Sequence, residues 1–210
     1  MPRRQALIGK INLEEKVKQR TQDLEASKEE LKLLASIDPM TKLYNRRYFS
    51  EVSEDIFNVS KRTNNDVSLI MFDIDDFKNV NDTYGHHIGD KVIIGVADIL
   101  LENTRKSDIV CRFGGEEYII LVPDTELENS IQLAQTVREL VENMVITYDQ
   151  DKKLQVTISI GVSMVDIEVD NDIEIAINKA DNALYEAKRS GKNKVCSYAE
   201  NYELEDNYTI

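Results

Sequence analysis

A pair of glycines, Gly114 and Gly115, joins two short apolar segments and constrains the fold more than any other feature of the sequence. The segments cover residues 109–113 and 117–122, and both carry the β-branched and aromatic residues typical of strands. A two-residue connection between strands requires positive φ angles, which glycine adopts without a steric penalty. The sequence therefore predicts a tight antiparallel hairpin at this point.

Strand and helix patterns alternate along the chain on both sides of this hairpin. Further strands are expected at residues 67–73, 154–165 and 194–198. Apolar residues at helical spacing predict helices at residues 46–61, 88–103, 127–143 and 173–190. The order βαββαβ, with an extra helix and strand appended, predicts a ferredoxin-like α+β fold with a mostly antiparallel sheet rather than a doubly wound parallel one.

The segment from residue 12 to residue 36 has a different pattern. It contains no Gly or Pro, and Val17, Leu24 and Leu31 recur every seven residues. This pattern predicts a helical stalk, either a dimerising coiled coil or a single solvated helix. Asp38-Pro39 would end the helix, because proline disfavours the α conformation in the residue before it. We therefore expect a stalk at 1–37, one domain at 38–200 and a tail at 201–210.

Composition limits the class of protein. The 210 residues carry a net charge of −13, which argues against a general nucleic-acid binder. No apolar run approaches the roughly 20 residues that span a bilayer, and no signal peptide is evident at the start. Cys111 and Cys196 lack the CxxC spacing of a zinc site, so we expect a reduced, cytoplasmic protein.

The segment 72–90, FDIDDFKNVNDTYGHHIGD, is the richest in chemistry, because an apolar strand runs directly into a series of carboxylates. Asp73, Asp75 and Asp76 follow one another at the predicted strand end. A calcium loop of the EF-hand type is rejected, since Phe77 and Lys78 stand where that loop requires a ligand and a glycine. From this segment alone, a magnesium site and a solvated turn remain the two alternatives.

The hairpin adds a second pair of carboxylates, Glu116 and Glu117. Neighbouring residues of a strand point to opposite faces, so one of these glutamates can face Asp73 if the two strands lie side by side. Mg²⁺ prefers oxygen ligands, takes one or two protein carboxylates and leaves positions for substrate phosphates. Such a palm-like cluster suits the attack of a hydroxyl group on phosphorus, with Mg²⁺ or Mn²⁺ as the cofactor.

Four segments together resemble one known family. RFGGEEY at 112–118 is similar to the GGDEF or GGEEF signature of diguanylate cyclases, and DPMTKLYNRRYF at 38–49, the segment 72–90 and ALYEAKRSGKNKV at 183–195 are similar to other blocks of that family, in the family's order. The resemblance covers about 38–198. Tyr118 replaces the usual Phe, and its hydroxyl needs a partner if it is buried.

The resemblance implies a role for each matching residue around the metal. Asp73, the backbone carbonyl of Ile74 and Glu117 would bind Mg²⁺. Glu116 would act as a metal ligand or as the general base for the attacking 3′-hydroxyl group, and these two roles stay open. Gly114 and Gly115 would let the nucleotide lie close to the hairpin.

The resemblance also assigns the nucleotide contacts. Asn81 and Asp90 would read guanine, and a carboxylate at Asp90 suits GTP over ATP because it accepts from N1–H and the N2 amine. Phe77, Lys78, Lys188 and Lys192 would contact the triphosphate; at Lys192 the family more often has Arg. Arg105 and Asp108 form an RxxD motif at the spacing of the family's inhibitory product site, where a surface turn with a local ion pair is the alternative.

The function implied is therefore a diguanylate cyclase that condenses two GTP into cyclic di-GMP and two pyrophosphates. Each domain would bind one GTP, so the active species would be a homodimer, with Arg105 and Asp108 giving product inhibition. A sensor domain, absent from this sequence, would supply the input. The alternatives are a catalytically inactive cyclic di-GMP receptor and a purely structural dimerisation module.

Overall fold

We describe the protein from a computed structural model, which covers residues 16–24, 27, 35–149 and 151–198. The chain divides into two units, Met1–Ile37 and Asp38–Ile210. In the first unit, residues 16–24 are helical and exposed, including Val17 and Leu24. The rest of the predicted stalk helix, except residues 27, 35 and 36, and the predicted tail at 201–210 lie outside the described residues.

The second unit is built on a six-stranded sheet. In spatial order its strands are β1 (Tyr44–Asn45), β3 (Ile109–Arg112), β4 (Glu117–Pro123), β2 (Val67–Ile74), β7 (Ile158–Met164) and β8 (Val195–Ser197). The four central strands pair antiparallel, and the short edge strands β1 and β8 pair parallel. Of the four central strands, β2 comes first in the sequence and lies between β4 and β7, the third and the fourth. This is the ferredoxin-like order, and the predicted fold is confirmed.

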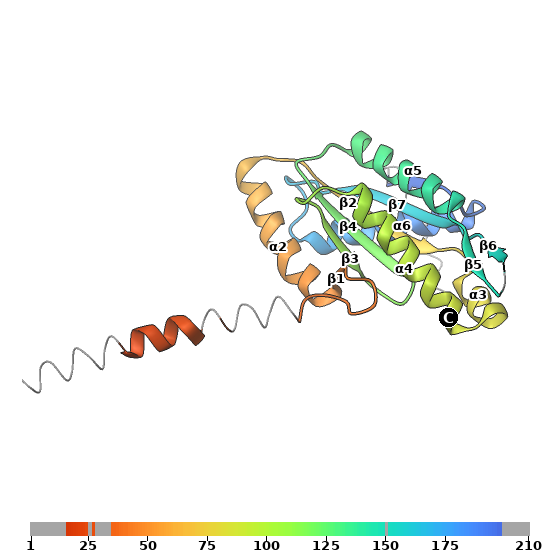
Figure 1. Ribbon diagram of the computed structural model, residues 1–210. Helices are drawn as coiled ribbons and strands as arrows, with labels where there is room; N and C mark the ends of the chain where they lie inside the picture. Colours follow the sequence, from red (N-terminus) through yellow and green to blue (C-terminus); the bar gives the residue numbers. More distant parts are fainter. Residues whose placement is uncertain (1–15, 25–26, 28–34, 150, 199–210) are drawn as a thin grey trace, which may run out of the picture. The chain divides into compact units, whose positions relative to one another are not determined.

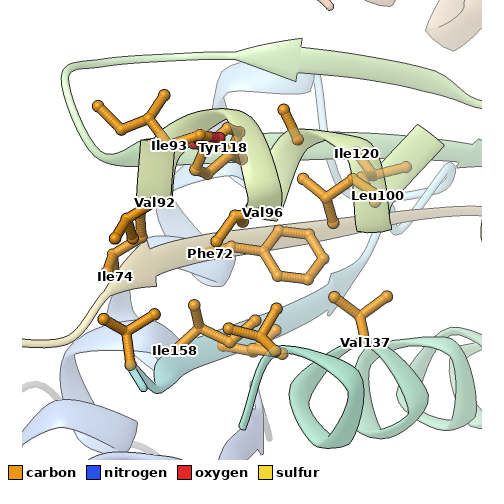
Figure 2. Close-up of a cluster of buried hydrophobic side chains, with 14 of the residues drawn as sticks. Phe72, Ile74, Val92, Ile93, Val96, Leu100, Tyr118, Ile120, Val137 and Ile158 are labelled. Carbon is orange, nitrogen blue, oxygen red and sulfur yellow. Dashed lines mark hydrogen bonds between the residues drawn. The ribbon is translucent and has the colours of Figure 1, made fainter. Parts of the chain in front are cut away.

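Helices cover both faces of this sheet (Figure 1). They are α2 (Arg46–Thr63), α3 (Phe77–Tyr84), α4 (His86–Asn103), α5 (Leu127–Asn143) and α6 (Ile173–Arg189). On one face, α4 and α5 enclose a core around Phe72, Tyr118 and Ile158 (Figure 2). On the other face, α2 and α6 pack over Leu69 and Met71. None of the helices in the described part of the chain is long and apolar enough to span a membrane.

The pattern of β2 explains this three-layer arrangement. All eight residues of VSLIMFDI are buried, as expected for a central strand that is covered on both faces. Because side chains alternate, Phe72 points toward α4 and α5, whereas Met71 belongs to the core under α2 and α6. Asp73 has the same parity as Met71, so the strand delivers its last carboxylate to the face covered by α6.

Tyr118 is fully buried on β4, and its hydroxyl donates a hydrogen bond of 2.9 Å to the backbone oxygen of Ile93 on α4. The partner expected for a buried tyrosine is therefore present.

The structure differs from the sequence patterns in helix α3 and in the strand at 154–165. Residues 77–84 form helix α3, where the sequence patterns indicated a loop. The helix was missed because its two buried apolar residues, Phe77 and Val80, are too short a pattern to stand out. The predicted strand at 154–165 is divided: β6 (Lys152–Leu154) pairs with β5 (Ile146–Tyr148), and β7 pairs with β2. No Gly or Pro stands between Leu154 and Ile158 to mark a break, and only the change of pairing partner separates the two strands.

Candidate active site

The acidic site forms where β2 ends beside the hairpin. Asp73 stands directly opposite Glu117 in the β2–β4 register, and directly opposite Ser159 in the β2–β7 register. Residues paired across antiparallel strands project from the same face. The expectation that one hairpin glutamate faces Asp73 is therefore correct, and that residue is Glu117.

Asp73 is a buried carboxylate that is paired with a lysine. Its side chain pairs with the ammonium group of Lys188 on α6 at 2.8 Å, and the residue is only 7% exposed. Burial raises the pKa of the Asp73 carboxyl, Lys188 opposes the rise, and the negative charges of Glu116 and Glu117 add to it. The three carboxylates are thus close enough to influence one another's ionisation.

The hairpin turn differs from the prediction. The Phe113 N–H donates a hydrogen bond of 2.8 Å to the backbone oxygen of Glu117. The connection between the strands therefore contains three residues, 114–116, rather than two. Among the described residues, only Gly85 and Gly191 are glycines with positive φ, so Gly114 and Gly115 do not serve a left-handed turn. Gly114 instead provides room, because a Cβ there would overlap the carboxylate of Glu117.

Arg112 holds the tip of this hairpin. Its guanidinium donates two hydrogen bonds to the Gly115 oxygen, at 2.8 and 3.2 Å, and pairs with Asp38 at 3.4 Å. Partial burial opposes ionisation of Asp38, but hydrogen bonds from Thr41 and the charge of Arg112 lower the pKa of Asp38 below its usual value. The start of the domain is thereby fastened to the turn that carries the glutamates.

The residues expected to read guanine lie at the corner between α3 and α4. Asn81 and Asp90 are both half-buried, and the Asn81 side chain lies against the backbone of Gly89, next to Asp90. Phe77 is buried at the start of α3, and Lys78 beside it is exposed. An amide side chain on α3 thus lies against the first turn of α4, one residue before the carboxylate of Asp90.

The lysines expected to contact phosphate lie around the end of α6. Lys188 pairs with Asp73, and Lys192 pairs with Asp76 at 2.6 Å. Contact with Asp76 raises the pKa of the Lys192 ammonium group. Both cations therefore stand beside the strand end from which the acidic residues project.

The donor set suits a hard divalent cation. Asp73, Glu116, Glu117 and the Ile74 carbonyl are oxygen donors of the type that Mg²⁺ prefers. The Ile74 N–H donates a hydrogen bond of 3.3 Å to the backbone oxygen of Glu116, which joins the two segments. Within residues 16–24, 27, 35–149 and 151–198, no three His, Cys, Asp or Glu side chains already converge as a metal-ligand group.

Comparison with known proteins identifies the family. The family model for the diguanylate cyclase GGDEF domain matches residues 35–194. The chain belongs to the GGDEF domain family. Response regulator PleD of Caulobacter vibrioides is 40% identical over 167 residues, covering 79% of this chain and 37% of the relative. Diguanylate cyclase A of Treponema denticola is 41% identical over 165 residues, covering 77% of this chain and 44% of the relative. The chain spans less than half the length of these two relatives.

A solved structure supports the same assignment for the fold. The GGDEF domain of DgcB from Caulobacter crescentus, in complex with c-di-GMP, superposes with a TM-score of 0.75 at 28% identity, covering 78% of this chain and 93% of that domain. The mixed α and β architecture with its mostly antiparallel sheet is thus the one found in GGDEF domain structures.

The RxxD motif of this GGDEF domain forms a turn in which Asp108 is buried and Arg105 is exposed. The buried carboxylate of Asp108 accepts from the Arg105 N–H at 2.7 Å and from the Ser107 hydroxyl at 3.2 Å. The Arg105 side chain is exposed. Asp108 therefore shapes the turn through the backbone of Arg105, which leaves the guanidinium directed to the surface.

One polar network in this GGDEF domain was missed from the sequence. Asp75, part of the acidic segment at the end of β2, is buried and accepts hydrogen bonds from Ser159 on β7 and from Thr157 just before that strand. The hydroxyl residues at 157, 159 and 163 alternate with apolar residues, and this alternation was the available signal. It could not be matched to Asp75 without knowing that β7 pairs with β2.

Proposed function

We propose that this chain is a diguanylate cyclase, which condenses two GTP molecules into cyclic di-GMP and releases two pyrophosphates. The observation that carries the proposal is the register of β2 and β4, which sets Asp73 against Glu117 at the edge bearing Lys188. Membership of the GGDEF domain family supports the choice of nucleotide reaction.

The bond changes are the same in each half of the reaction. The 3′-oxygen of one GTP attacks the α-phosphorus of the other, an O–P bond forms, the bond to the β-phosphate oxygen breaks, and pyrophosphate leaves. Asp73, Glu117 and the Ile74 carbonyl would hold Mg²⁺ or Mn²⁺, which when bound neutralises phosphate charge and acidifies the hydroxyl group. Glu116 would receive the 3′-proton or complete the metal shell.

The remaining residues would orient the nucleotide. Asn81 and Asp90 at the α3–α4 corner would bind the guanine edge, and Lys188 and Lys192 would leave their acidic partners to bind the triphosphate. Phe77 and Lys78 would line the approach to the phosphates. Gly114 and Gly115, which have no side chains, would let the nucleotide lie close to the hairpin.

A single domain would hold only half of the reactants, so we propose that two copies meet face to face and that catalysis requires a homodimer. The RxxD turn would bind the product through the exposed side chain of Arg105, since a guanidinium group can contact phosphate and guanine edges together. Asp108 would maintain the turn. We further propose that a sensor domain outside this sequence regulates the cyclase.

Removal of one hairpin carboxylate tests the catalytic assignment. After bound nucleotide is stripped, Mg²⁺ and GTP are added and products are identified by mass. We expect wild type to form cyclic di-GMP and Glu116→Ala to lose at least about 100-fold in rate, the usual scale for loss of acid–base catalysis. Glu54→Ala, which removes an exposed carboxylate from α2, is the matched control and should keep wild-type activity.

The same assay distinguishes the alternative functions. If concentrated wild-type protein makes no cyclic di-GMP from GTP but binds added cyclic di-GMP, the receptor function replaces the enzyme. If neither reaction nor binding is seen, a structural dimerisation module is the better description.

Product inhibition is tested separately with Arg105→Ala. Because the Arg105 side chain is exposed and Asp108 uses only its backbone N–H, this substitution should leave the turn folded. We expect the variant to continue synthesis past the product concentration at which wild type stalls, with about tenfold or more weaker binding of cyclic di-GMP. Lys106→Ala, at an exposed neighbouring position, is the control, and equal stalling of Arg105→Ala and wild type would refute the inhibitory site.

A further inference from the structure

The loop after α6 has an unusual backbone. Gly191, Lys192 and Asn193 are consecutive residues with positive φ angles of 115°, 61° and 46°. Left-handed conformations are unfavourable for residues with a Cβ, and they persist only where the surroundings hold them. This loop contains Lys192, one of the three lysines assigned to the triphosphate, and neighbouring groups must hold its conformation.

The first support is the carboxylate of Asp75. It accepts hydrogen bonds from the Thr157 hydroxyl at 2.7 Å, the Ser159 hydroxyl at 2.6 Å and the Asn193 N–H at 3.1 Å. Asp75 is 7% exposed, and its own N–H donates to the Thr157 oxygen at 2.9 Å. The end of β2, the start of β7 and the loop are thus joined at one buried carboxyl group.

The second support comes from α5 and acts on the side chain of Asn193. Arg138 donates to the Asn193 oxygen at 3.0 Å, and the Asn193 amide donates to Glu142 at 2.8 Å. Arg138 and Glu142 also pair with each other at 2.7 Å. The amide of Asn193 is therefore fixed at both its donor and its acceptor atom.

These two supports determine where Lys192 lies. Its N–H binds the Ala187 oxygen at 3.0 Å, its ammonium group reaches Asp76, and the next residue in the chain is the one held by Asp75 and α5. Neither Asp75 nor Asn193 was assigned to the metal, to guanine or to phosphate. Asp75 directly follows Ile74, which is assigned to the metal, and Asn193 directly follows Lys192, which is assigned to the triphosphate.

We propose that Asp75 and Asn193 are positioning residues of the triphosphate site, which hold the left-handed loop 191–193 and so present Lys192 to the substrate phosphates. The inference rests on the proposed function only in naming a guanosine triphosphate as the ligand.

The test uses binding rather than turnover. The full chain is titrated with Mg²⁺ and a GTP analogue that has a methylene group between the α- and β-phosphorus atoms, which prevents release of pyrophosphate. GMP is titrated in parallel, because it keeps the guanine but lacks the phosphates that Lys192 would contact. Folding of each variant is followed by thermal melting.

Asp75→Asn should weaken binding of the triphosphate analogue about tenfold, the scale for loss of a charge-assisted hydrogen bond, while GMP affinity stays within about twofold. Ser163→Ala is the matched control. It removes a buried hydroxyl from the same face of β7, whose hydrogen bond to the Ala176 oxygen measures 2.7 Å, and it should leave both affinities unchanged.

Substitutions of Asn193 provide a second test if Asp75→Asn does not fold. Asn193→Gly keeps the left-handed backbone but loses the bracing from Arg138 and Glu142, whereas Asn193→Ala loses both. We expect triphosphate affinity to fall in the order wild type, Asn193→Gly, Asn193→Ala. In the background of Lys192→Ala, Asp75→Asn should cause less than half of its own effect on the logarithm of the affinity.

Three outcomes would overturn the inference: unchanged triphosphate affinity in Asp75→Asn, equal weakening of GMP and triphosphate, or full additivity with Lys192→Ala. Wild-type protein that binds the analogue but makes no cyclic di-GMP would refute the proposed cyclase while leaving the positioning role to be decided by these affinities. Wild-type protein that binds no guanosine triphosphate would refute both.

Discussion

At the scale of single residues, the main conflict in the molecule is the negative charge at the end of β2. Asp73 is buried beside Glu116 and Glu117, and the ammonium group of Lys188 compensates only part of the cost. Buried ionised groups are stabilising only when pairing exceeds the loss of hydration. Here the raised pKa of the Asp73 carboxyl indicates that ionisation is less favourable in the folded chain than in the unfolded chain.

This gives a pH-dependent prediction for Asp73→Asn. A carboxyl whose folded-state pKa exceeds its ordinary value of 3.8 stabilises the fold when protonated, below about pH 4, and that contribution is lost as the pH rises through the folded-state pKa. Removing the charge should therefore raise the melting temperature of the nucleotide-free protein at pH 7, and the gain should shrink toward pH 4. Cyclase activity should be abolished.

Differential scanning calorimetry at several pH values measures this effect. Asp82→Asn, which removes an exposed charge from α3, is the control and should melt with wild type at each pH. A lower melting temperature for Asp73→Asn at pH 7 would mean that the pair with Lys188 outweighs burial.

The residues of the site were predictable to different degrees. Asp73 could be matched in advance to one of the two hairpin glutamates, because side chains alternate along a strand, but only the register of β2 and β4 identifies that glutamate as Glu117. Asp75 could not be separated from the other acidic residues, since its partners Thr157, Ser159 and Asn193 lie more than 80 positions away. Local patterns contain no information about such distant partners.

At the scale of elements, the contact between β7 and α6 determines where the lysines stand. A Cβ at Gly161 would overlap the backbone of α6 at Ala180 and Leu184, so the strand and the helix touch main chain to main chain. Lys188 lies one turn beyond Leu184 on the same helix. The position of its ammonium group therefore depends on this close approach.

Gly161→Ala should consequently damage both stability and activity. We expect a loss of about 1–3 kcal/mol in the free energy of unfolding, the usual cost of overpacking, because backbone atoms cannot move aside as a flexible side chain can. Activity should fall as well, since Lys188 is carried outward with α6. Urea denaturation and initial rates are the measurements.

Gly115→Ala is the matched control for stability, because a Cβ at that position meets open space. Its free energy of unfolding should stay within about 0.5 kcal/mol of wild type. Equal destabilisation by the two substitutions would argue against the importance of the helix-strand contact.

Elements were predicted well where their patterns are long. The 17- and 18-residue helices and the buried strands were recognised because each repeats its period several times. The 8-residue helix α3 and the 3-residue strands β5 and β6 were not, because they offer a single apolar pair or none. The glycine turn was predicted at the right place for the wrong reason, as Gly114 supplies space rather than a left-handed backbone.

At the scale of the whole molecule, the proposed reaction requires two copies of the chain. If each domain contributes one GTP, the rate should follow the concentration of dimer rather than of protein. We expect initial rates to rise about fourfold for each doubling of the concentration of dilute enzyme. At concentrations where nearly all chains are dimeric, the rate should become proportional to the enzyme concentration. Pyrophosphate release, measured alongside sedimentation velocity, tests this relation.

A rate strictly proportional to protein concentration, over a range in which sedimentation detects mostly monomer, would contradict the two-domain mechanism. Adding an excess of Glu116→Ala chains to dilute wild type is a further check, because mixed dimers would lower the rate per wild-type chain.

The position of the site within the sheet has a consequence for how the protein fails. Asp73 is one of the last residues of β2, a strand whose residues are all buried and which is hydrogen-bonded to β4 on one side and β7 on the other. A strand enclosed in this way exchanges its amide protons only when the cooperative unit opens. Heat inactivation should therefore coincide with global melting, and partly active, partly unfolded forms should not accumulate.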